Sequence, residues 1–453
     1  MVTFQNVRIE KIQLDIQKLR GSISGSRILQ LSDLHIARFG NREARLVSLV
    51  NREDPDIIFI TGDLVNSYQD DFSACIQTLK SIKARHGIYA VFGNAEHTFK
   101  PIHLVNDFRN ALTDINVTLL NNSNTELRLN GDRLYLVGVD DPFFLFDKFD
   151  EAIQGVPQGA PTVLLAHSPD IVFPRSDALV INLLDSELKR DRSRSWGWED
   201  STVFGPENGD VYFKEDGAHT IRVQSRQDGV SLDTIILNPY EEIDQMLETK
   251  DFKQVHELLT SGEILDKYPD LAVISAHNIE KQNMFGKWKR ERDRSSLFNY
   301  RLDDLPPEKW HMQPLVDPKD YFEAEFHAKE NVRYHVWIRL KAHKGSPFND
   351  SVYLQFSDSV DKNGKERYRI NKPAYSKERM KDVDLILTGH THGGQIRLPI
   401  YGPLATMTAV GRKYASGLYE LGRSMLYVSR GYGTSVIPFR LFCPSEITVF
   451  TFL

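Results

Sequence analysis

The chain has 453 residues, with 56 Lys or Arg, 62 Asp or Glu and a formal net charge of −6. At roughly 100–200 residues per domain this length predicts two or three domains. The slight acidic excess argues against a duplex-DNA binder, so we expect no nucleic-acid partner, and a hydrophobic share of 41% excludes a mainly disordered or fibrous chain.

The first part of the chain alternates short apolar runs with charged, helix-like segments, which is the pattern of a sheet flanked by helices. Amphipathic helices are predicted over residues 42–51 and 72–84. The predicted strands are 27–31, 56–60, 87–92, 134–139 and 162–166, followed near the end of the chain by 384–388, 425–429 and 446–452. We therefore expect an α/β domain that the middle of the chain interrupts.

Between about residues 177 and 376 the sequence pattern changes, and apolar and polar residues alternate with period 2, as in 220–224, 334–340 and 351–356. Such alternation is typical of half-buried antiparallel strands. A helical connector is predicted near 241–270. The predicted organisation is an inserted, jelly-roll-like β-sandwich over 177–376, with the α/β core divided into 1–176 and 377–453.

No apolar run approaches the ~18 residues of a membrane-spanning helix, and the N-terminal segment lacks the apolar core of a signal peptide. As written, the sequence predicts a cytoplasmic protein, with export or a peripheral position at a membrane as alternatives. Two cysteines, Cys75 and Cys443, are too few for a disulfide framework, and we interpret them as buried free thiols.

Five short segments, each directly after an apolar strand, hold the candidate metal ligands. Functional groups of open α/β sheets collect at the carboxyl ends of strands, so residues far apart in sequence can meet there. Imidazole, carboxylate and amide oxygen together suit Mn²⁺, Fe or Zn²⁺ better than Ca²⁺, and a bridging carboxylate lets such a set hold two ions for phosphoester hydrolysis. The seven residues are Asp33, His35, Asp63, Asn94, His167, His390 and His392.

The ordered motifs SDLH, TGD, GNAEH, LLAHSPD and TGHTHGGQ resemble the calcineurin-like metallophosphoesterase superfamily. GHTHGGQIRLP and SRGYGTSVIPFRLFCPSEIT are similar to its bacterial branch of often membrane-associated phosphohydrolases. The resemblance covers 7–174 and 377–453 and implies a four-layer αββα sandwich with two divalent metal ions, Mn²⁺ first and Fe or Zn²⁺ as alternatives. It implies one metal held by Asp33, His35, Asp63 and His392, and another held by Asp63, Asn94, His167 and His390.

The segment GNAEH departs from the family pattern at one position. The family usually has a histidine after GN, which helps to stabilise the phosphate or to protonate the leaving group, and this chain has Ala95 there. His97 is a candidate substitute, although a two-residue displacement moves a side chain by several ångströms. Asn94 and His97 are the candidate catalytic residues, and substrates with good leaving groups, such as pyrophosphates or activated diesters, are favoured.

Three other polar residues near the motifs have two interpretations each. Asp140 and Asp141 in GVDDP either reach the site or form the turn that ends a strand, and a turn explains them at least as well. Arg430 either contacts a phosphate or makes a structural ion pair.

The inserted region resembles a second family in two pieces. Residues 320–357 are similar to the front half of a bacterial β-sandwich related to carbohydrate-binding jelly rolls, and residues 195–239 to its back half. The resemblance implies a circularly permuted module, which is cheap when chain termini lie close together. Because the insertion falls between the His167 and His390 motifs, we expect the module to project from the rim of the active site.

The aromatic residues of the insert are candidates for stacking on sugar rings, but at period two they are also typical of a sandwich core. They are Trp196, Trp198, Trp337 and Tyr353. Asn349 and Asp350 are as compatible with a ligand or Ca²⁺ site as with a turn.

Together these features predict a dinuclear metal-dependent phosphohydrolase that cleaves phosphodiester or pyrophosphate bonds by attack of a metal-bridged hydroxide. The expected partner is a phosphoester substrate, and the bacterial branch suggests a glycan- or lipid-linked one with peripheral membrane contact. The alternatives are a catalytically weakened metallophosphoesterase-fold scaffold and a carbohydrate-binding protein.

Overall fold

The structure is a computed structural model, and its chain divides into two compact units. Unit 1 comprises Met1–Phe173 and Tyr375–Leu453, and unit 2 comprises Pro174–Ala374. The expected boundaries after residues 176 and 376 lie within three residues of this division. The described residues are 7–99, 103–129, 131–172, 175–183, 196–200, 209–226, 229–249, 252–305, 313–342, 351–374, 380–406, 408, 410–435 and 437–453.

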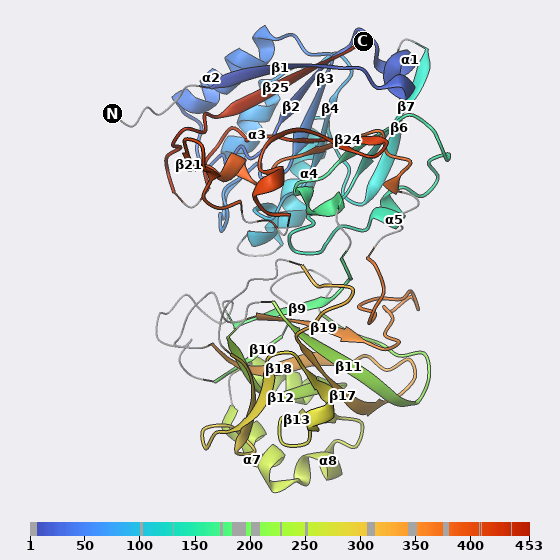
Figure 1. The fold of residues 1–453 in the computed structure, drawn as a ribbon, viewed down its shortest axis with the longest axis vertical. Helices are drawn as coiled ribbons and strands as arrows, with labels where there is room; N and C mark the ends of the chain where they lie inside the picture. The colour runs from blue at the N-terminus through green and yellow to red at the C-terminus, as the bar shows by residue number, and fades with distance from the viewer. Residues whose placement is uncertain are drawn as a thin grey trace. The chain divides into compact units, whose positions relative to one another are not determined.

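The first sheet of unit 1 joins both ends of the chain. Its strand order is β1-β25-β2-β3-β4-β5, in which β2 to β5 are parallel and β25 is antiparallel to β2 (Figure 1). The strands are β1 (Arg8–Leu14), β2 (Arg27–Leu31), β3 (Ile57–Thr61), β4 (Ile88–Val91), β5 (Val117–Leu119) and β25 (Glu446–Phe452). The parallel run places the carboxyl ends of β2, β3 and β4 at one edge.

The second sheet of unit 1 has the order β23-β24-β20-β8-β7-β6, with a parallel centre and antiparallel outer strands. Its strands are β6 (Ser123–Leu129), β7 (Asp132–Gly138), β8 (Thr162–Leu165), β20 (Leu385–Thr388), β23 (Gly417–Leu421) and β24 (Ser424–Val428). Here β8 and β20, which come from the two separate segments of unit 1, are parallel neighbours.

The two sheets of unit 1 share a hydrophobic core to which β2, β3, β7, β8 and β20 contribute. A second core lies between the first sheet and helices α2, α3 and α4. The α-helices of this unit are α1 (Arg20–Ile23), α2 (Asn41–Arg52), α3 (Ser73–Lys80), α4 (Leu104–Asp114) and α5 (Phe149–Ala152). Unit 1 is therefore the expected α/β fold, although α5 against β6 is only a single turn.

Local sequence explains why these elements form. Strands β3, β8 and β20 are buried along their whole length and are apolar except for one threonine each, as expected of parallel strands covered on both faces. In α2 the buried side chains include Leu46 and Val50, four residues apart on one face, and Glu43 accepts a hydrogen bond from Gly40 N at 3.0 Å. The predicted helix over 72–84 is too long, because α3 ends at Lys80 and Lys83 N donates instead to Asn51 Oδ1.

Unit 2 contains two sheets whose inner faces contribute to one hydrophobic core. One has the order β10-β18-β12-β16-β15 with β13 beside β12, and the other β14-β17-β11-β19-β9. The strands are β9 (Leu179–Asn182), β10 (Gly197–Glu199), β11 (Gly217–Ser225), β12 (Val230–Asn238), β13 (Ala272–Ser275), β14 (Met284–Phe285), β15 (Trp288–Arg292), β16 (Tyr300–Asp304), β17 (Tyr321–Ala328), β18 (His335–Ala342) and β19 (Ser351–Phe356).

The predicted helical connector is three helices, α6 (Glu241–Glu248), α7 (Phe252–Ser261) and α8 (Glu263–Lys267). Their apolar faces pack in one cluster with Trp198 and Trp337. These two side chains are 4% and 5% exposed and Tyr353 is 1% exposed. These three aromatic residues are therefore part of the hydrophobic core of unit 2. Asn349 and Asp350 lie outside the described residues. Within the described ranges, no helix is long and apolar enough to cross a membrane.

Candidate metal centre

The predicted ligands of unit 1 all lie in loops that follow strands. Asp33 and His35 follow β2, Asp63 follows β3, and Asn94 follows β4. From the second sheet, His167 follows β8, and His390 and His392 follow β20. Both sheets therefore deliver polar side chains at the carboxyl ends of adjacent parallel strands.

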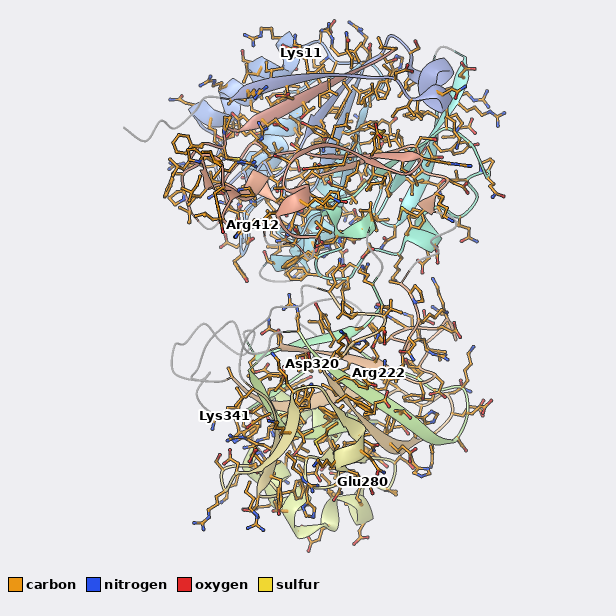
Figure 2. The ribbon with its side chains drawn as sticks, viewed as in Figure 1. Lys11, Arg222, Glu280, Asp320, Lys341 and Arg412 are labelled. Carbon is orange, nitrogen blue, oxygen red and sulfur yellow. The ribbon has the colours of Figure 1, made fainter. Side chains whose placement is uncertain are left out.

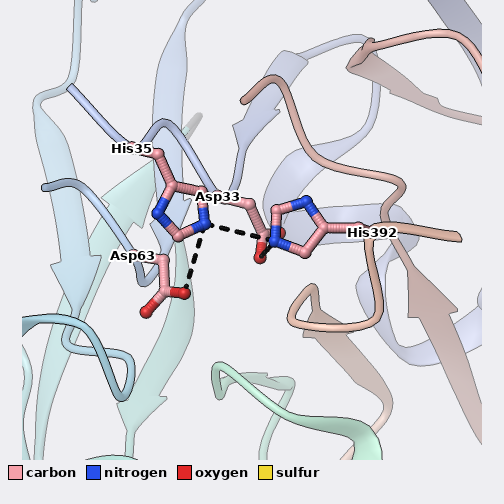
Figure 3. A group of neighbouring side chains, drawn as sticks. All are labelled: Asp33, His35, Asp63 and His392. Atoms are coloured by element: carbon pink, nitrogen blue, oxygen red, sulfur yellow. Dashed lines mark hydrogen bonds and ion pairs between the residues drawn. The ribbon is translucent and has the colours of Figure 1, made fainter. Parts of the chain in front are cut away.

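Four of these side chains form a compact, buried cluster: Asp33, His35, Asp63 and His392 each place one ligand atom within 4.8 Å of the others (Figure 3). The Nε2 atoms of His35 and His392 are 3.1 Å apart. His35 Nε2 lies 3.4 Å from Asp63 Oδ2, and His392 Nε2 lies 3.4 Å from Asp33 Oδ1. Two imidazoles and two carboxylates that converge without an intervening side chain are suited to a divalent cation.

Asp63 connects this cluster to a second pair of histidines. Its Oδ1 lies 3.4 Å from His167 Nε2, which in turn lies 3.1 Å from His390 Nδ1. His167 Nδ1 lies 2.8 Å from the carbonyl oxygen of Thr61, so Nδ1 carries a hydrogen, and Nε2 is the atom that faces Asp63. Burial opposes the charged imidazolium, but the carboxylate of Asp63 outweighs it and raises the pKa of His167; a bound metal would replace the proton on Nε2. The carboxylate of Asp63 thus faces both histidine pairs with separate oxygens.

Asn94 supplies an independent observation that the donor set fits a metal. Its Oδ1 is buried and has no hydrogen-bond partner among the described residues. The next residue, Ala95, donates its N–H to Asp63 Oδ1 at 2.9 Å, which ties the Asn94 loop to the carboxylate of Asp63. A buried amide oxygen without a partner is costly unless something binds it, and a cation is such a partner.

Five of the seven predicted ligands have a positive φ: Asp33 at 51°, His35 at 46°, Asp63 at 52°, His390 at 66° and His392 at 50°. This conformation is uncommon outside glycine and is strained. Strained residues cluster at functional sites because the surrounding structure must hold them in place. The backbone therefore marks the same loops as the side chains do.

Two glycines are required by close approach around these residues. A Cβ at Gly93 would meet the carboxylate of Asp63, and one at Gly389 would meet Ser32 Oγ. The glycines of the GN and GH motifs thus allow the loops of two sheets to pack against each other.

Glu96 organises the loops and was not predicted as a site residue. Its carboxylate accepts hydrogen bonds from the backbone N–H groups of Asp63, Leu64, Val65 and Gly93 at 2.7–3.2 Å. Burial and the neighbouring Asp63 raise the pKa of Glu96 to about 8. The sequence did contain a signal for Glu96. The family motif has an acid after its histidine, and GNAEH keeps that acid although Ala95 replaces the histidine.

His97, a candidate catalytic residue, contacts Asp140, one of the residues with two interpretations. Its Nε2 lies 2.6 Å from Asp140 Oδ1, and its ring packs against Phe92 and Phe146. Burial opposes the charged imidazolium, but the carboxylate of Asp140 outweighs it and raises the pKa of His97. Asp140 therefore orients His97, and among the described residues the Nδ1 atom of His97 has no partner.

The other two ambiguous residues make structural contacts. Asp141 Oδ2 accepts a hydrogen bond from Phe144 N at 2.8 Å, which is a turn contact, while its Oδ1 is buried and has no hydrogen-bond partner among the described residues. Burial raises the pKa of Asp141 to about 7. Arg430 Nη1 lies 3.3 Å from Glu446 Oε2, so the ion-pair interpretation of Arg430 is the one observed. Cys75 and Cys443 are free and buried, as predicted.

Arg440, which the sequence did not single out, supports His392 from behind. Its guanidinium donates to the carbonyl oxygens of His392 at 3.1 Å, Arg430 at 2.8 Å and Gly433 at 2.9 Å. Arg440 Nη2 also lies 3.1 Å from His392 Nδ1. Burial, His35 and this guanidinium hold the pKa of His392 well below its ordinary value, and a neutral imidazole is the form that binds metals.

A cavity of about 880 Å³ opens beside the cluster and includes His35 in its lining. Its other walls come from the start of α2, the loop after β3 and the loop near Thr434, with Arg38, Asn41 and Ser67 among the polar groups. Arg38 and Asn41 are exposed, and neither side chain has a partner within the described part of the chain. The volume is within the range of small-molecule sites.

Comparison with known proteins gives one family. Residues 26–213 match the family model described as calcineurin-like phosphoesterase. This span contains five of the seven predicted ligands and ends before His390 and His392. It also runs past Phe173 into unit 2. The structure puts the end of the first segment of unit 1 at Phe173, because β9, which follows it, pairs with β19 of unit 2.

Individual relatives carry related names. The chain is 51% identical over 69 residues to "Uncharacterized metallophosphoesterase YkuE" of Bacillus subtilis (strain 168), covering 15% of this chain and 24% of that protein. It is 29% identical over 191 residues to "Putative metallophosphoesterase F40B5.2" of Caenorhabditis elegans, covering 40% and 38%. It is 44% identical over 77 residues to "Phosphodiesterase YaeI" of Escherichia coli (strain K12), covering 16% and 27%. The matched part of the chain thus spans about a quarter to two fifths of the length of these relatives.

Proposed function

This chain belongs to the calcineurin-like metallophosphoesterase superfamily, and from that membership we propose that unit 1 hydrolyses phosphoester bonds with two divalent cations. The observation that carries the proposal is Asp63, whose two carboxylate oxygens face His35 and His167 on opposite sides. A single bridging carboxylate between two imidazole groups is what a dinuclear site needs.

The proposed ligands divide at Asp63. One cation would be held by Asp33, His35, Asp63 and His392, and the other by Asp63, Asn94, His167 and His390. Manganese is the proposed metal, with iron or zinc as alternatives, because the donors mix nitrogen and oxygen. When bound, the pair of cations would polarise the phosphoryl group and lower the pKa of a water molecule.

The chain's own residues position the reacting groups. Glu96 fixes the loops after β3 and β4 through four backbone donors, and Arg440 fixes the loop of His392. His97, oriented by Asp140, is proposed to donate a proton to the leaving group through Nδ1, in place of the histidine that Ala95 replaces. Ala95 is fully buried, so this position itself presents nothing to a substrate.

The proposed substrates are phosphodiesters or pyrophosphates with good leaving groups. A proton donor displaced from the family position assists poor leaving groups less, so such substrates depend on it least. The cavity beside His35 is large enough to hold the organic part of such a molecule. A glycan- or lipid-linked substrate is proposed from the bacterial motifs.

For unit 2 we propose the inserted, circularly permuted β-sandwich module. Its support is that strands of the two sequence halves are interleaved: β12 of one half pairs with β18 of the other, and β11 pairs with β17 and β19. With Trp198, Trp337 and Tyr353 buried, Trp196 is the partly exposed member of the four aromatic candidates. A glycan array with the full chain and its Trp196→Ala variant tests carbohydrate binding.

The test of the phosphohydrolase is Mn²⁺-dependent cleavage of bis(p-nitrophenyl) phosphate. We expect activity in the native chain, loss of at least about 10²-fold in Asp63→Asn, and no change in Asp114→Asn, which alters an exposed carboxylate at the end of α4. Calorimetry with Mn²⁺ accompanies the assay. Binding of two equivalents without cleavage of any phosphodiester or pyrophosphate would favour the weakened scaffold instead.

A further inference from the structure

The cavity beside His35 has walls from three loops of unit 1. They are the loop after β2 with the start of α2, the loop after β3, and the loop near Thr434. His35 lies in the wall, and its Nε2 belongs to the buried cluster of Figure 3, so the cavity begins at the metal centre. A cavity of about 880 Å³ in this place is suited to the organic part of a substrate.

The polar side chains of the wall are available to a ligand. In the described part of the chain, the side chains of Asn41, Asn66 and Ser67 have no hydrogen-bond partner. Thr434 and Ser435 add hydroxyl groups from the third loop. Amide and hydroxyl groups donate and accept hydrogen bonds, and an acyl chain would remove them from water without replacing those bonds. The wall therefore favours a hydrophilic ligand.

One positive charge in the wall is not neutralised by a described residue. Arg42 Nε lies 2.7 Å from Oε1 of Glu43, which is 4% exposed, so the charges of these two wall residues cancel. Arg38 is exposed and has no acidic partner in the ranges that the structure describes. Arg222 of unit 2, labelled in Figure 2, shows the opposite case, because its Nε donates to Glu323 at 2.8 Å. The cavity beside His35 thus has a net positive charge.

The walls are fixed relative to the metal ligands. His35 N donates to the carbonyl oxygen of Asp63 at 3.0 Å, which joins the loops after β2 and β3. Arg42 Nη2 donates to the carbonyl oxygens of Leu34 and His35 at 2.9 Å, and Tyr432 OH donates to Arg42 O at 2.8 Å. These bonds connect all three walls, so a group bound in the cavity would have a set position relative to the metal centre.

The proposed proton donor lies outside the cavity. Residues 94–99 and 140–146, which include His97 and Asp140, are described, and none of them lines it. Since His97 is the proposed donor to the leaving group, the cavity is left for the group that stays on the attacked phosphorus.

We propose that the cavity binds the retained organic group of a phosphodiester substrate, and that this group is hydrophilic and carries a second phosphate, which Arg38 contacts. The planar guanidinium binds phosphate oxygens with two parallel hydrogen bonds, and the amide and hydroxyl groups of the wall bind the rest. This inference rests on the proposed hydrolysis and adds the substrate class, a diester with a phosphorylated arm.

Two esters with the same leaving group test the proposal. They are p-nitrophenyl propyl phosphate and p-nitrophenyl 3-phosphopropyl phosphate, which differ only in the second phosphate. With Mn²⁺, we expect kcat/KM of the native chain to be about fivefold higher for the phosphorylated ester, with a smaller preference at high salt. Arg38→Gln should remove the preference, and Arg38→Lys should keep part of it. The control Arg52→Gln, at an exposed residue at the end of α2, should keep it in full.

Equilibrium binding separates the cavity from the reaction. Calorimetry of the Mn²⁺-loaded chain compares 1,3-propanediol bisphosphate with propyl phosphate. We expect the native chain to bind the bisphosphate about fivefold more tightly, and Arg38→Gln to bind the two compounds equally. A preference that survives in Arg38→Gln would show that the cations, and not the cavity, hold the second phosphate, and it would overturn the proposal.

The two proposals fail in different ways. A native chain that cleaves bis(p-nitrophenyl) phosphate but shows no preference in either experiment overturns the phosphate site and leaves the hydrolase standing. Arg38-dependent binding of the bisphosphate without cleavage of any ester supports the phosphate site and overturns the hydrolase.

Discussion

His35 and His392 are separated by 357 positions in the sequence, yet their Nε2 atoms lie 3.1 Å apart and their rings are stacked. Each nitrogen also lies 3.4 Å from a carboxylate oxygen, of Asp63 for His35 and of Asp33 for His392. The chain forms this group with both histidines and both aspartates at positive φ, so it accepts strain to do so. A bound cation would offset that strain with coordination bonds.

Metal should therefore stabilise unit 1. At a Mn²⁺ concentration of 100 times the dissociation constant, binding adds about 2.7 kcal/mol to the free energy of unfolding per site. We expect a clear rise in melting temperature by scanning calorimetry, reversed by EDTA. The rise should be smaller in His392→Gln and unchanged in His103→Gln, whose side chain is 70% exposed. An equal rise in both variants would contradict the site.

Glu96 should be important for folding rather than for binding. Replacing it by glutamine keeps the size but turns an NH₂ group toward backbone N–H donors that the carboxylate now satisfies. We expect a loss of about 1–3 kcal/mol in the free energy of unfolding, measured with urea. The matched change Glu420→Gln, at an exposed residue of β23, should have no measurable effect.

Arg440 should affect metal affinity without touching the metal. Lysine at this position keeps the charge but lacks the planar fork that reaches several carbonyl oxygens at once. By analogy with other outer partners of metal ligands, Arg440→Lys should weaken Mn²⁺ binding by about 10–100-fold in calorimetry. Arg423→Lys, at an exposed residue, is the control. Equal affinities in the two variants would leave Arg440 with a folding role alone.

His97 should matter in proportion to the leaving group. His97→Gln is expected to lower kcat/KM by about 10²-fold for a substrate with an alkyl leaving group. It should change the rate little when p-nitrophenolate, which leaves unprotonated, is released. Asp140→Asn should give the same pattern more weakly, since Asp140 acts through His97. A uniform loss with both leaving groups would instead indicate that His97 positions the loop.

The environment of His335 in unit 2 should make the free energy of unfolding depend on pH. Burial opposes its charged form, but Asp200 and Asp210 at 2.9 Å raise the pKa of His335 from 6.5 to about 9. Since the folded state binds this proton more tightly, the stabilisation is complete below pH 6.5 and is lost as pH rises through 9. Its size is about 3 kcal/mol.

Urea denaturation of the native chain and of His335→Gln tests this prediction. The difference between the two free energies of unfolding should shrink from below pH 6.5 to above pH 9. His277→Gln, at an exposed residue, should follow the native curve. A constant difference across this range would show that the two carboxylates do not hold the proton.

Pattern along the chain was enough to predict the strands that lead into the metal centre and the loops that carry its polar residues. Runs such as 27–31 and 162–166 specify strands because their apolar residues can be buried only in a covered sheet, and these strands begin where predicted. Strands β1, β5, β6 and β23 and helix α4 were not predicted. In β1 the alternation of charged and apolar residues is weak evidence until β25 pairs with it.

How the loops are held depends on contacts that no local pattern predicts. Glu96 contacts residues about 30 positions away, Arg440 contacts the carbonyl of His392, and Asp140 meets His97 across 43 positions. The tertiary structure likewise decides that Trp198 and Trp337 are buried and that Ile400 is exposed. Periodicity describes neighbours along one strand or helix, whereas these contacts depend on which strands pair and how loops of two sheets meet.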